Sequence, residues 1–500
     1  MAFRELLGSA RTATFAAGAL PIVSFPRPGL DWLAWVALVP GLLLIRAAQS
    51  GREAAIRGWW FGAGYCAAAG YWLLPDIGPG VALAAFVFGA LWAGWGFAAW
   101  KVRSWAALVV VPSAWTAVEF VRSWHSLGGP WALLGASQWH HPAELGLAAI
   151  GGVWLVGFAV VEVNTALVLL LTQRSPMYVP AIVAGLLAGP ITYALAAPPA
   201  SGSTVRVALV QVGVIHDPAA RLDAALRITA ALPPGRLDLV VWGESSVAFD
   251  LDRSPGMVGR LESAASRLGA DLLVNVDAQD ALGRISKTSI LIGPSGIAGR
   301  YTKTLLVPFG EYIPFRPGLG WLTGISRAAR QDRVPGTGVR VLQAGGLTFG
   351  PLVCFEATFP DLGRAEVRSG ARMIVYQSAM STFQGSWALR QQASLGAVRA
   401  AETGRPVVQA ALSGVSAGFD SRGRLLAWLE SHRTGALSVT LTVPPSTEGT
   451  LYDRFGDFVP YLALAMIAGY SLSWYALSSW KRTLRTSRRD SVPVARRTGG

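Results

Sequence analysis

Long apolar runs constrain this chain more than any other feature of its sequence. A helix that crosses the hydrocarbon core of a membrane needs about 20 consecutive apolar residues. Seven such candidates precede residue 200 and an eighth lies near the C-terminus: 8–25, 29–46, 55–74, 80–100, 105–122, 145–172, 178–197 and 457–480. The sequence therefore predicts a membrane-embedded α-helical bundle of about eight transmembrane helices.

Composition agrees with this interpretation. Hydrophobic residues make up 52% of the 500 residues and charged residues only 14%, whereas typical soluble domains are roughly 25% charged. The first run follows Arg4 and Arg11 and shares this pattern with secretory signal peptides. Because a second apolar run comes immediately after it, we expect the first run to be retained as a helix.

The placement of Lys and Arg predicts how the bundle is oriented, because cytoplasmic loops are enriched in these residues. Alternate connections hold most of them, and the remaining connections are nearly uncharged, with Arg27 in one and Arg122 at the edge of another. The basic residues of the first set are Arg46, Arg52, Arg57, Lys101, Arg103, Arg174 and seven in the tail 481–500. This bias predicts that both termini are cytoplasmic and that residues 201–455 lie on the extracytoplasmic face.

The net charge of +14 raises the question of nucleic-acid binding. The last 20 residues hold seven Lys or Arg and one Asp, so +6 of that charge lies in one tail. A basic tail directly after an apolar span is typical of a cytoplasmic anchor. We therefore expect the membrane, and no nucleic acid, as a partner.

Residues 201–455 have the pattern of an α/β domain. Examples of the expected strands are 205–212, 238–242, 271–276, 288–292, 347–355, 373–376, 407–412 and 437–443, and helices are expected at about 218–232, 255–269, 359–370 and 386–403. Strands that alternate with helices predict a layered α/β fold. The expected organisation is a bundle of about seven helices (1–200), an α/β domain (201–455), a last transmembrane helix (456–480) and a basic tail (481–500).

Three residues in this domain border apolar segments and could carry chemistry. Glu244 follows the segment 239–243, and a lone carboxylate there is usually a solvated strand end. Lys303 precedes an apolar run, which favours a partly buried ammonium suited to an oxyanion. Cys354 ends an apolar strand and could be a small core residue, but the nearby Glu356 weakens that interpretation because carboxylates rarely enter a core unpaired.

These three residue types form a coherent reaction set. A free thiol with a pKa of about 8.5 is mostly protonated near neutral pH, so a carboxylate that takes its proton during attack would activate it. An ammonium would then offset the oxyanion. The other cysteine, Cys66, lies in an apolar run, so we expect no disulfide. His140 and His141 have no companion ligands in sequence, and we expect no metal and no cofactor.

The order Glu, Lys, Cys, each at a strand end, resembles the nitrilase or carbon–nitrogen hydrolase superfamily, which has an αββα sandwich. Over nearly its whole length the chain more closely resembles the bacterial apolipoprotein N-acyltransferase family. The matching motifs are 305–314 (LLVPFGEYIP), 129–138, 151–164 and 450–457. The resemblance implies that Glu244 is the general base, Lys303 the oxyanion residue and Cys354 the nucleophile. It also implies that Glu311, Phe355 and Glu356 support the active site.

The resemblance also implies the reaction and its location. An acyl chain would pass from a membrane phospholipid, through a Cys354 thioester, to the N-terminal amine of the S-diacylglyceryl-cysteine of a lipoprotein. The enzyme would be a multi-pass protein of the bacterial cytoplasmic membrane. Residues 378–383 and 412–416 depart from the family motifs, in a way that resembles actinobacterial members, and they leave the acyl preference open. The apolar stretch 314–325 is expected to dip toward lipid as a lid.

Two other functions fit parts of the same sequence. A membrane-anchored amidase or nitrilase would use the same chemistry with water as the acceptor. A non-catalytic scaffold could anchor a polyprenol-phosphate glycosyltransferase. The intact set of Glu244, Lys303 and Cys354 argues against the scaffold.

Overall fold

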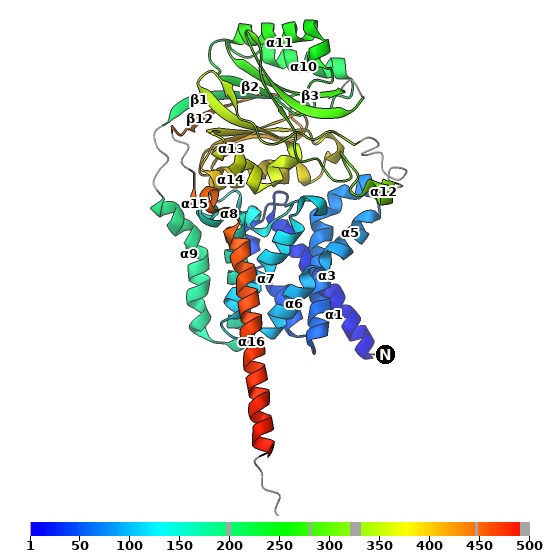
Figure 1. Cartoon of the computed structure of the whole chain (residues 1–500), viewed down its shortest axis with the longest axis vertical. Helices are drawn as coiled ribbons and strands as arrows, with labels where there is room; N and C mark the ends of the chain where they lie inside the picture. The colour runs from blue at the N-terminus through cyan, green and yellow to red at the C-terminus, as the bar shows by residue number, and fades with distance from the viewer. Residues whose placement is uncertain (1, 197–201, 280–282, 321–331, 446–448, 491–500) are drawn as a thin grey trace, which may run out of the picture.

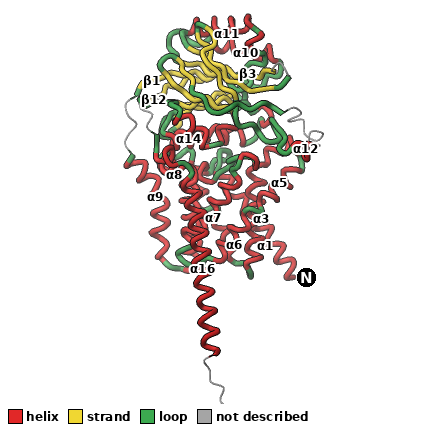
Figure 2. The backbone as a smooth tube through the Cα atoms, viewed as in Figure 1, coloured by secondary structure: helices red, strands yellow, loops and turns green. Residues whose placement is uncertain are grey.

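The computed structural model describes residues 2–196, 202–279, 283–320, 332–445 and 449–490. The chain forms a helical bundle with an α/β domain above it, and the long helix α16 (Phe458–Asp490) runs alongside the bundle and beyond it (Figure 1). Strands are confined to the upper part, and loops gather where the two parts meet (Figure 2). The α/β domain, which contains the candidate reactive side chains, therefore lies directly against the apolar helical bundle.

The bundle is built around α3 (Gly51–Gly70), which packs against α1 (Ala2–Ala19), α5 (Gly80–Gly89) and α6 (Trp92–Lys101). Small residues allow these close approaches, as is common between membrane helices. A Cβ on Gly58 of α3 would lie 2.8 Å from the Cα of Gly96 in α6. The remaining helices are α2 (Val39–Arg46), α4 (Leu74–Ile77), α7 (Ala107–Arg122), α8 (Ala148–Gln173) and α9 (Val179–Leu195).

Within the described residues, four stretches are long and apolar enough to cross a membrane. They are Gly80–Lys101, Glu144–Gln173, Pro176–Leu195 and Phe458–Ala476, and they coincide with four of the eight predicted runs. The other runs contain helices that are shorter or less apolar. The run 29–46 splits into a 3₁₀ turn (Asp31–Trp35) and the eight-residue α2, which is about 12 Å long against a hydrocarbon core of about 30 Å. A membrane region is supported, and the full set of eight spans stays a prediction.

The α/β domain contains two six-stranded sheets. The strand order is β12-β1-β2-β3-β4-β5 in the first sheet and β11-β10-β9-β8-β7-β6 in the second. The strands are β1 (Ser203–Gln211), β2 (Leu239–Trp242), β3 (Asp271–Gln279), β4 (Ile285–Gly293), β5 (Gly296–Thr302), β6 (Leu342–Ala344), β7 (Leu347–Val353), β8 (Met373–Ser378), β9 (Val407–Ala411), β10 (Ser416–Phe419), β11 (Leu425–Leu429) and β12 (Gly435–Val443). β1, β2 and β3 run parallel to one another, as do β7, β8 and β9.

Apolar side chains from both sheets, such as Leu209, Val241 and Phe349, form a core between them. Helices α10 (Pro218–Ala230) and α11 (Pro255–Leu268) cover the outer face, and α13 (Pro360–Arg368) and α14 (Ala388–Thr403) lie between the sheets and the bundle (Figure 1). The predicted αββα sandwich is confirmed. The prediction of a strand to residue 355 was wrong at its end, because β7 stops at Val353 and Cys354 begins a 3₁₀ turn.

A kink in α8 joins the bundle to the sandwich. Gly151 and Gly152 leave helical geometry, and Gly152 has φ +67° and ψ −174°, a combination open to glycine almost alone. The N–H of Val153 donates to Glu402 Oε1 of α14 at 2.8 Å. Glu402 is fully buried and pairs with Arg399 at 2.9 Å. The orientation of α14, which borders the candidate site, is thereby tied to a bundle helix.

Candidate active site

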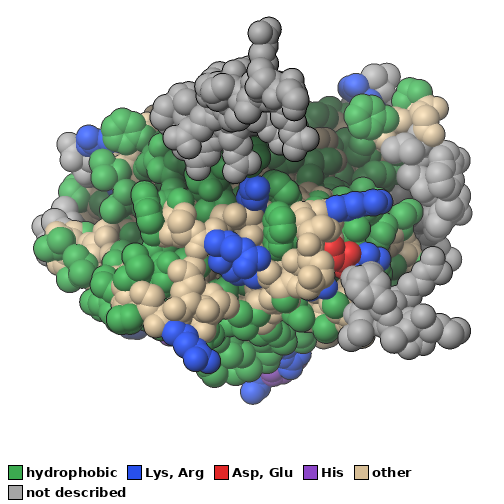
Figure 3. Space-filling model, turned by 90° about the horizontal axis from the view of Figure 1, so that it is seen from below, with side chains coloured by type: hydrophobic (Ala, Val, Ile, Leu, Met, Phe, Trp, Pro, Cys, Tyr) green, Lys and Arg blue, Asp and Glu red, His purple; other side chains and the backbone are tan. Residues whose placement is uncertain are grey.

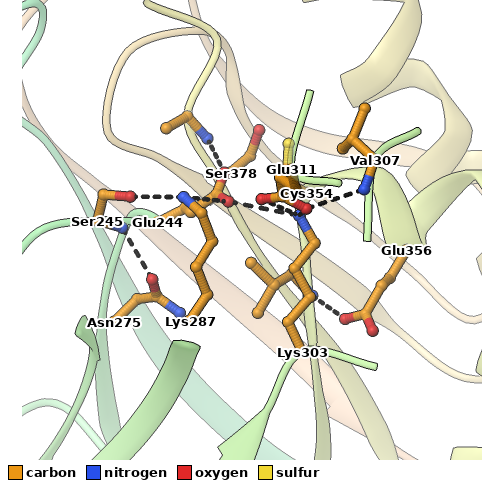
Figure 4. A network of polar contacts seen from close by, with 12 residues as sticks. Glu244, Ser245, Asn275, Lys287, Lys303, Val307, Glu311, Cys354, Glu356 and Ser378 are labelled. Atoms are coloured by element: carbon orange, nitrogen blue, oxygen red, sulfur yellow. Dashed lines mark hydrogen bonds and ion pairs between the residues drawn. The ribbon is translucent and has the colours of Figure 1, made fainter. Parts of the chain in front are cut away.

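The ends of β2, β5 and β7 bring Glu244, Lys303 and Cys354 together (Figure 4). Glu244 and Lys303 are buried. The backbone of Glu244 is fixed by the end of β8, because its N–H donates to the Ser378 carbonyl at 3.2 Å. Its Oε2 accepts from the N–H of Ala379 at 3.0 Å. The two sheets therefore contribute jointly to one buried group of side chains.

Lys303 is held as an ammonium by carboxylates. Its Nζ lies 2.9 Å from Glu311 Oε2 and 3.6 Å from Glu244 Oε1. Burial would lower the pKa of Lys303, but the charges of Glu311 and Glu244 outweigh burial and raise that pKa. Burial alone would raise the pKa of Glu311. The positive charges of Lys303 and Lys287 outweigh burial, so the pKa of Glu311 is lowered. The site therefore contains a fixed positive charge, as an oxyanion would require.

Cys354 has a left-handed backbone with φ +51°, the strained conformation of a residue at a sharp turn. The Gln392 amide donates to its Sγ at 3.5 Å, and Gln392 is itself fixed by Ser378 Oγ at 2.6 Å. Burial raises the pKa of Cys354 to about 12, with Glu244 adding to the effect and Lys303 opposing it. The resting group is a thiol, which needs a base in order to attack.

Apolar side chains from both parts of the molecule surround this thiol. Met380, Ala388 and Leu389 form a buried cluster, and Cys354 packs against it together with Phe383, Trp72 and Trp131. Trp72 and Trp131 come from the bundle region, and their ring centroids are 5.1 Å apart. The thiol therefore lies where the bundle and the sandwich meet, in surroundings that suit an acyl chain.

Glu356 fixes the loops on both sides of the site. Its Oε1 accepts from the Tyr301 hydroxyl at 2.8 Å, the Thr304 hydroxyl at 2.8 Å and the N–H groups of Thr304 and Leu305 at 2.7 and 3.0 Å. Its Oε2 accepts from the N–H of Val353 at 2.7 Å. One carboxylate thus holds the segment after Lys303 against the segment before Cys354.

Phe355 points its ring toward aromatic neighbours. Its ring centroid is 5.0 Å from that of Phe359 and 6.1 Å from that of His125. His125 belongs to the bundle region and contacts the Leu306 carbonyl through Nε2 at 2.6 Å. Phe355 and His125 therefore pack the bundle against the segment that carries Glu311.

Sequence reasoning missed a second lysine. Lys287 Nζ lies 2.9 Å from Glu244 Oε1, closer than Lys303, and it is buried. The expected strand began at Thr288, three residues after the start of β4, and so left Lys287 out. Lys287 and Ser289 alternate inward on β4, and a lysine on the inward face of a strand was the available signal.

Asp277 and Arg333 were also missed. Arg333 Nη1 lies 2.7 Å from Asp277 Oδ1. Burial would raise the pKa of Asp277, but Lys287 and Arg333 overcome it and lower that pKa to about 2. Asp277 lies outside the expected strand 271–276, and Arg333 lies in a loop. No sequence pattern therefore identified either of them as a residue of the site.

The two stretches that depart from the family motifs contact each other. Ser381 Oγ and Ser413 Oγ are 2.6 Å apart, and the N–H of Met380 donates to the Ser413 carbonyl at 2.7 Å. Because Met380 belongs to the cluster around Cys354, the paired departures border the thiol. Of the expected lid 314–325, residues 321–325 lie outside the described part of the chain; Phe315, which is described, is 79% exposed.

Comparisons with known proteins agree with both parts of the chain. Residues 17–166 match the family model of the apolipoprotein N-acyltransferase N-terminal domain, and residues 206–447 match that of the carbon–nitrogen hydrolases. An apolipoprotein N-acyltransferase of Geobacter metallireducens is 30% identical over 486 residues, which cover 90% of this chain and 92% of that protein. One from Pseudomonas aeruginosa (strain UCBPP-PA14) is 29% identical, with coverage of 95% and 96%. The chain therefore belongs to the apolipoprotein N-acyltransferase family.

Proposed function

We propose that this enzyme transfers a fatty acyl chain from a membrane phospholipid, through a thioester on Cys354, to the N-terminal amine of the S-diacylglyceryl-cysteine of a lipoprotein. The observation that carries this proposal is the position of Cys354, beside a buried carboxylate and a buried ammonium and against apolar side chains of the bundle region. The family names of the relatives support lipoprotein N-acylation.

In the first half-reaction, Cys354 Sγ attacks the carbonyl carbon of a phospholipid ester. Glu244 takes the thiol proton as general base, and the Lys303 ammonium offsets the charge on the carbonyl oxygen. The bond from carbon to the glycerol oxygen then breaks. The departing oxygen takes the proton from Glu244, which leaves a lysophospholipid and an S-acyl cysteine.

In the second half-reaction, the amine of the lipoprotein attacks the thioester carbonyl. Glu244 receives the proton that the amine loses, the carbon–sulfur bond breaks, and the proton returns to the Cys354 thiolate. Glu311 keeps Lys303 in place during both steps. Glu356 and Phe355 are proposed to support the site by holding its loops, since their contacts are with backbone and aromatic groups.

A bundle in the membrane suits this reaction because donor and acceptor are both lipid-anchored. We propose that residues 1–200 and 456–480 form an eight-span bundle in the cytoplasmic membrane, with 201–455 on the extracytoplasmic face. Figure 3 shows Lys and Arg side chains on the opposite end of the bundle, and Arg52, Lys101, Arg103 and Arg174 are exposed. This distribution supports a cytoplasmic position for that end and for the tail 481–500.

The relatives are acyltransferases by name, so hydrolysis with water as the acceptor and a purely scaffolding role are not favoured. An amidase would also have no use for a thiol placed at the junction with an apolar bundle. The acceptor decides between these functions, and it is measurable.

The decisive experiment follows both half-reactions by mass spectrometry, with a labelled phospholipid as donor and a diacylglyceryl peptide as acceptor. We expect an acyl adduct on Cys354 that disappears as the N-acyl peptide forms. Cys354→Ala should abolish the adduct and Cys66→Ala should retain it. Release of free fatty acid without N-acyl peptide would establish the hydrolase instead.

Single-turnover acylation tests the two assigned side chains. Glu244→Gln keeps the size of the side chain but removes the base, and acylation should fall by roughly 10²–10⁴-fold. Lys303→Met removes the charge and should cost about 10²–10³ in rate. The variants are compared at equal abundance in the membrane. A variant that acylates at the wild-type rate removes its residue from the proposed mechanism.

A further inference from the structure

Six side chains of alternating charge form a closed ring at the candidate site (Figure 4 shows part of it). The successive nitrogen–oxygen distances are Lys287–Glu244 2.9 Å, Glu244–Lys303 3.6 Å, Lys303–Glu311 2.9 Å, Glu311–Arg333 3.9 Å, Arg333–Asp277 2.7 Å and Asp277–Lys287 3.6 Å. Three carboxylates and three cations leave the ring without net charge. Half of it, Asp277, Lys287 and Arg333, has no role in the mechanism above.

Lys287 is the member of that half that contacts the proposed base. Its Nζ is held on the other side by Ser245 Oγ at 2.8 Å and by Asp277. Ser245 is itself fixed, since its hydroxyl donates to Asp277 Oδ2 at 2.9 Å and its N–H donates to Asn275 Oδ1 at 2.8 Å. The ammonium therefore has one well-defined position, next to Glu244 Oε1.

This position separates the two oxygens of Glu244. Oε1 binds both ammonium groups, whereas Oε2 accepts a single backbone N–H, from Ala379. An oxygen next to two positive charges accepts a proton poorly. We propose that Lys287 is a positioning residue of the reaction, which occupies Glu244 Oε1 so that Oε2 receives the proton of Cys354.

Lys287 has a second effect, through the charge of the whole ring. When Glu244 takes the thiol proton it becomes neutral, and the remaining five ring charges sum to +1. That surplus offsets the new thiolate. Without Lys287 the surplus would vanish, and a thiolate would form in an apolar pocket without compensation. Lys287 is therefore expected to favour the attacking state as well as to orient the base.

The inference rests on the proposed function. A double-mutant cycle distinguishes a failure of the role of Lys287 from a failure of the proposed function. Single-turnover acylation is measured for Lys287→Met, Glu244→Gln and the double variant. We expect Lys287→Met to lower the rate about tenfold or more, the size of coupling seen between contacting residues. The double variant should lose clearly less than the product of the two single losses, because Lys287 acts in part through Glu244.

Each other outcome is informative. A wild-type rate for Lys287→Met, or a loss in the double variant equal to the product of the single losses, overturns the role of Lys287. A wild-type rate for Glu244→Gln overturns the base assignment instead. Lys287→Arg keeps the positive charge, so at equal abundance it should acylate faster than Lys287→Met. Equal acylation rates for these two variants would also overturn the proposal.

The pH profile distinguishes positioning from a structural role. The charged and titratable groups facing Lys287 are Glu244, Asp277, Glu311, Arg333 and Cys354, and Lys303 shares Glu244 Oε1 with it. In Lys287→Met the carboxylates lose a counter-charge and hold protons at higher pH, so the acid limb of the acylation rate should move to higher pH. The control Arg260→Met removes the cation of an exposed pair with Asp223 and should leave rate and profile unchanged. An unshifted acid limb in Lys287→Met contradicts the proposal.

Discussion

Cys354 lies in apolar surroundings beside Glu244, and both burial and the charge of that carboxylate keep its sulfur uncharged. Because burial raises the pKa of this thiol to about 12, the thiolate fraction at pH 8 should be about 10³-fold below that of an ordinary cysteine. We expect iodoacetamide to alkylate Cys354 correspondingly slowly, with a rate that rises about tenfold per pH unit. Mass spectrometry of the Cys66→Ala protein measures this, with the denatured protein as control. Alkylation at the speed of a free cysteine would contradict the burial of the thiol.

At the scale of elements, the kink of α8 couples the bundle to α14. A Cβ on Gly152 would lie 2.5 Å from the ring of Tyr452, at a backbone conformation that alanine disfavours. Gly152→Ala should therefore destabilise the protein by about 2 kcal/mol or more, with a lower melting temperature in detergent and slower acylation. Gly94→Ala is the matched control, since a Cβ there meets nothing within 4 Å. It should be neutral or stabilising by up to about 1 kcal/mol. Equal melting temperatures for the two variants would show that the kink has no such role.

At the scale of the whole molecule, the proposed topology assigns every loop to one side of the membrane. A reporter fused after Gly500 should be active in the cytoplasm, and one inserted near Ser203 should be active outside it, because loops rich in Lys and Arg are usually cytoplasmic. Paired reporters that are active in either compartment provide the measurement. The inverse pattern would place the thiol on the cytoplasmic face and require a different lipoprotein substrate pool.

Much of the fold was predictable from local sequence. The strands before Glu244 and Cys354 are buried and apolar, and the alternation with helices indicated the sandwich. Four strands are not among the examples that the sequence pattern provided, namely β5, β6, β10 and β11. β6 has three residues and β11 is only partly buried, so their patterns are weak. The predicted span 29–46 is not one helix, since the 3₁₀ turn ends at Trp35 and α2 begins only at Val39, with Pro40 in its first turn.

The candidate site was predictable only in part. Glu244 and Cys354 each follow an apolar segment and Lys303 precedes one, which is a local signal. Lys287, Asp277 and Arg333 become important through charges that tertiary packing brings to them. Arg333 meets Asp277 across 56 residues, and no pattern within either segment indicates that contact. Sequence therefore indicated the proposed reacting groups better than the groups proposed to orient them.

The bond between Val153 and Glu402 has a consequence for how the protein is made. The two residues are 249 positions apart, and ribosomes add roughly 5–20 residues per second. For roughly 12–50 seconds after Val153 is synthesised, its acceptor does not yet exist. A backbone N–H without a partner is costly in lipid, so the nascent α8 must remain straight or shielded by neighbouring helices during that interval. We therefore expect the hydrogen-bonded kink to form only after α14 has been synthesised and has packed against α8.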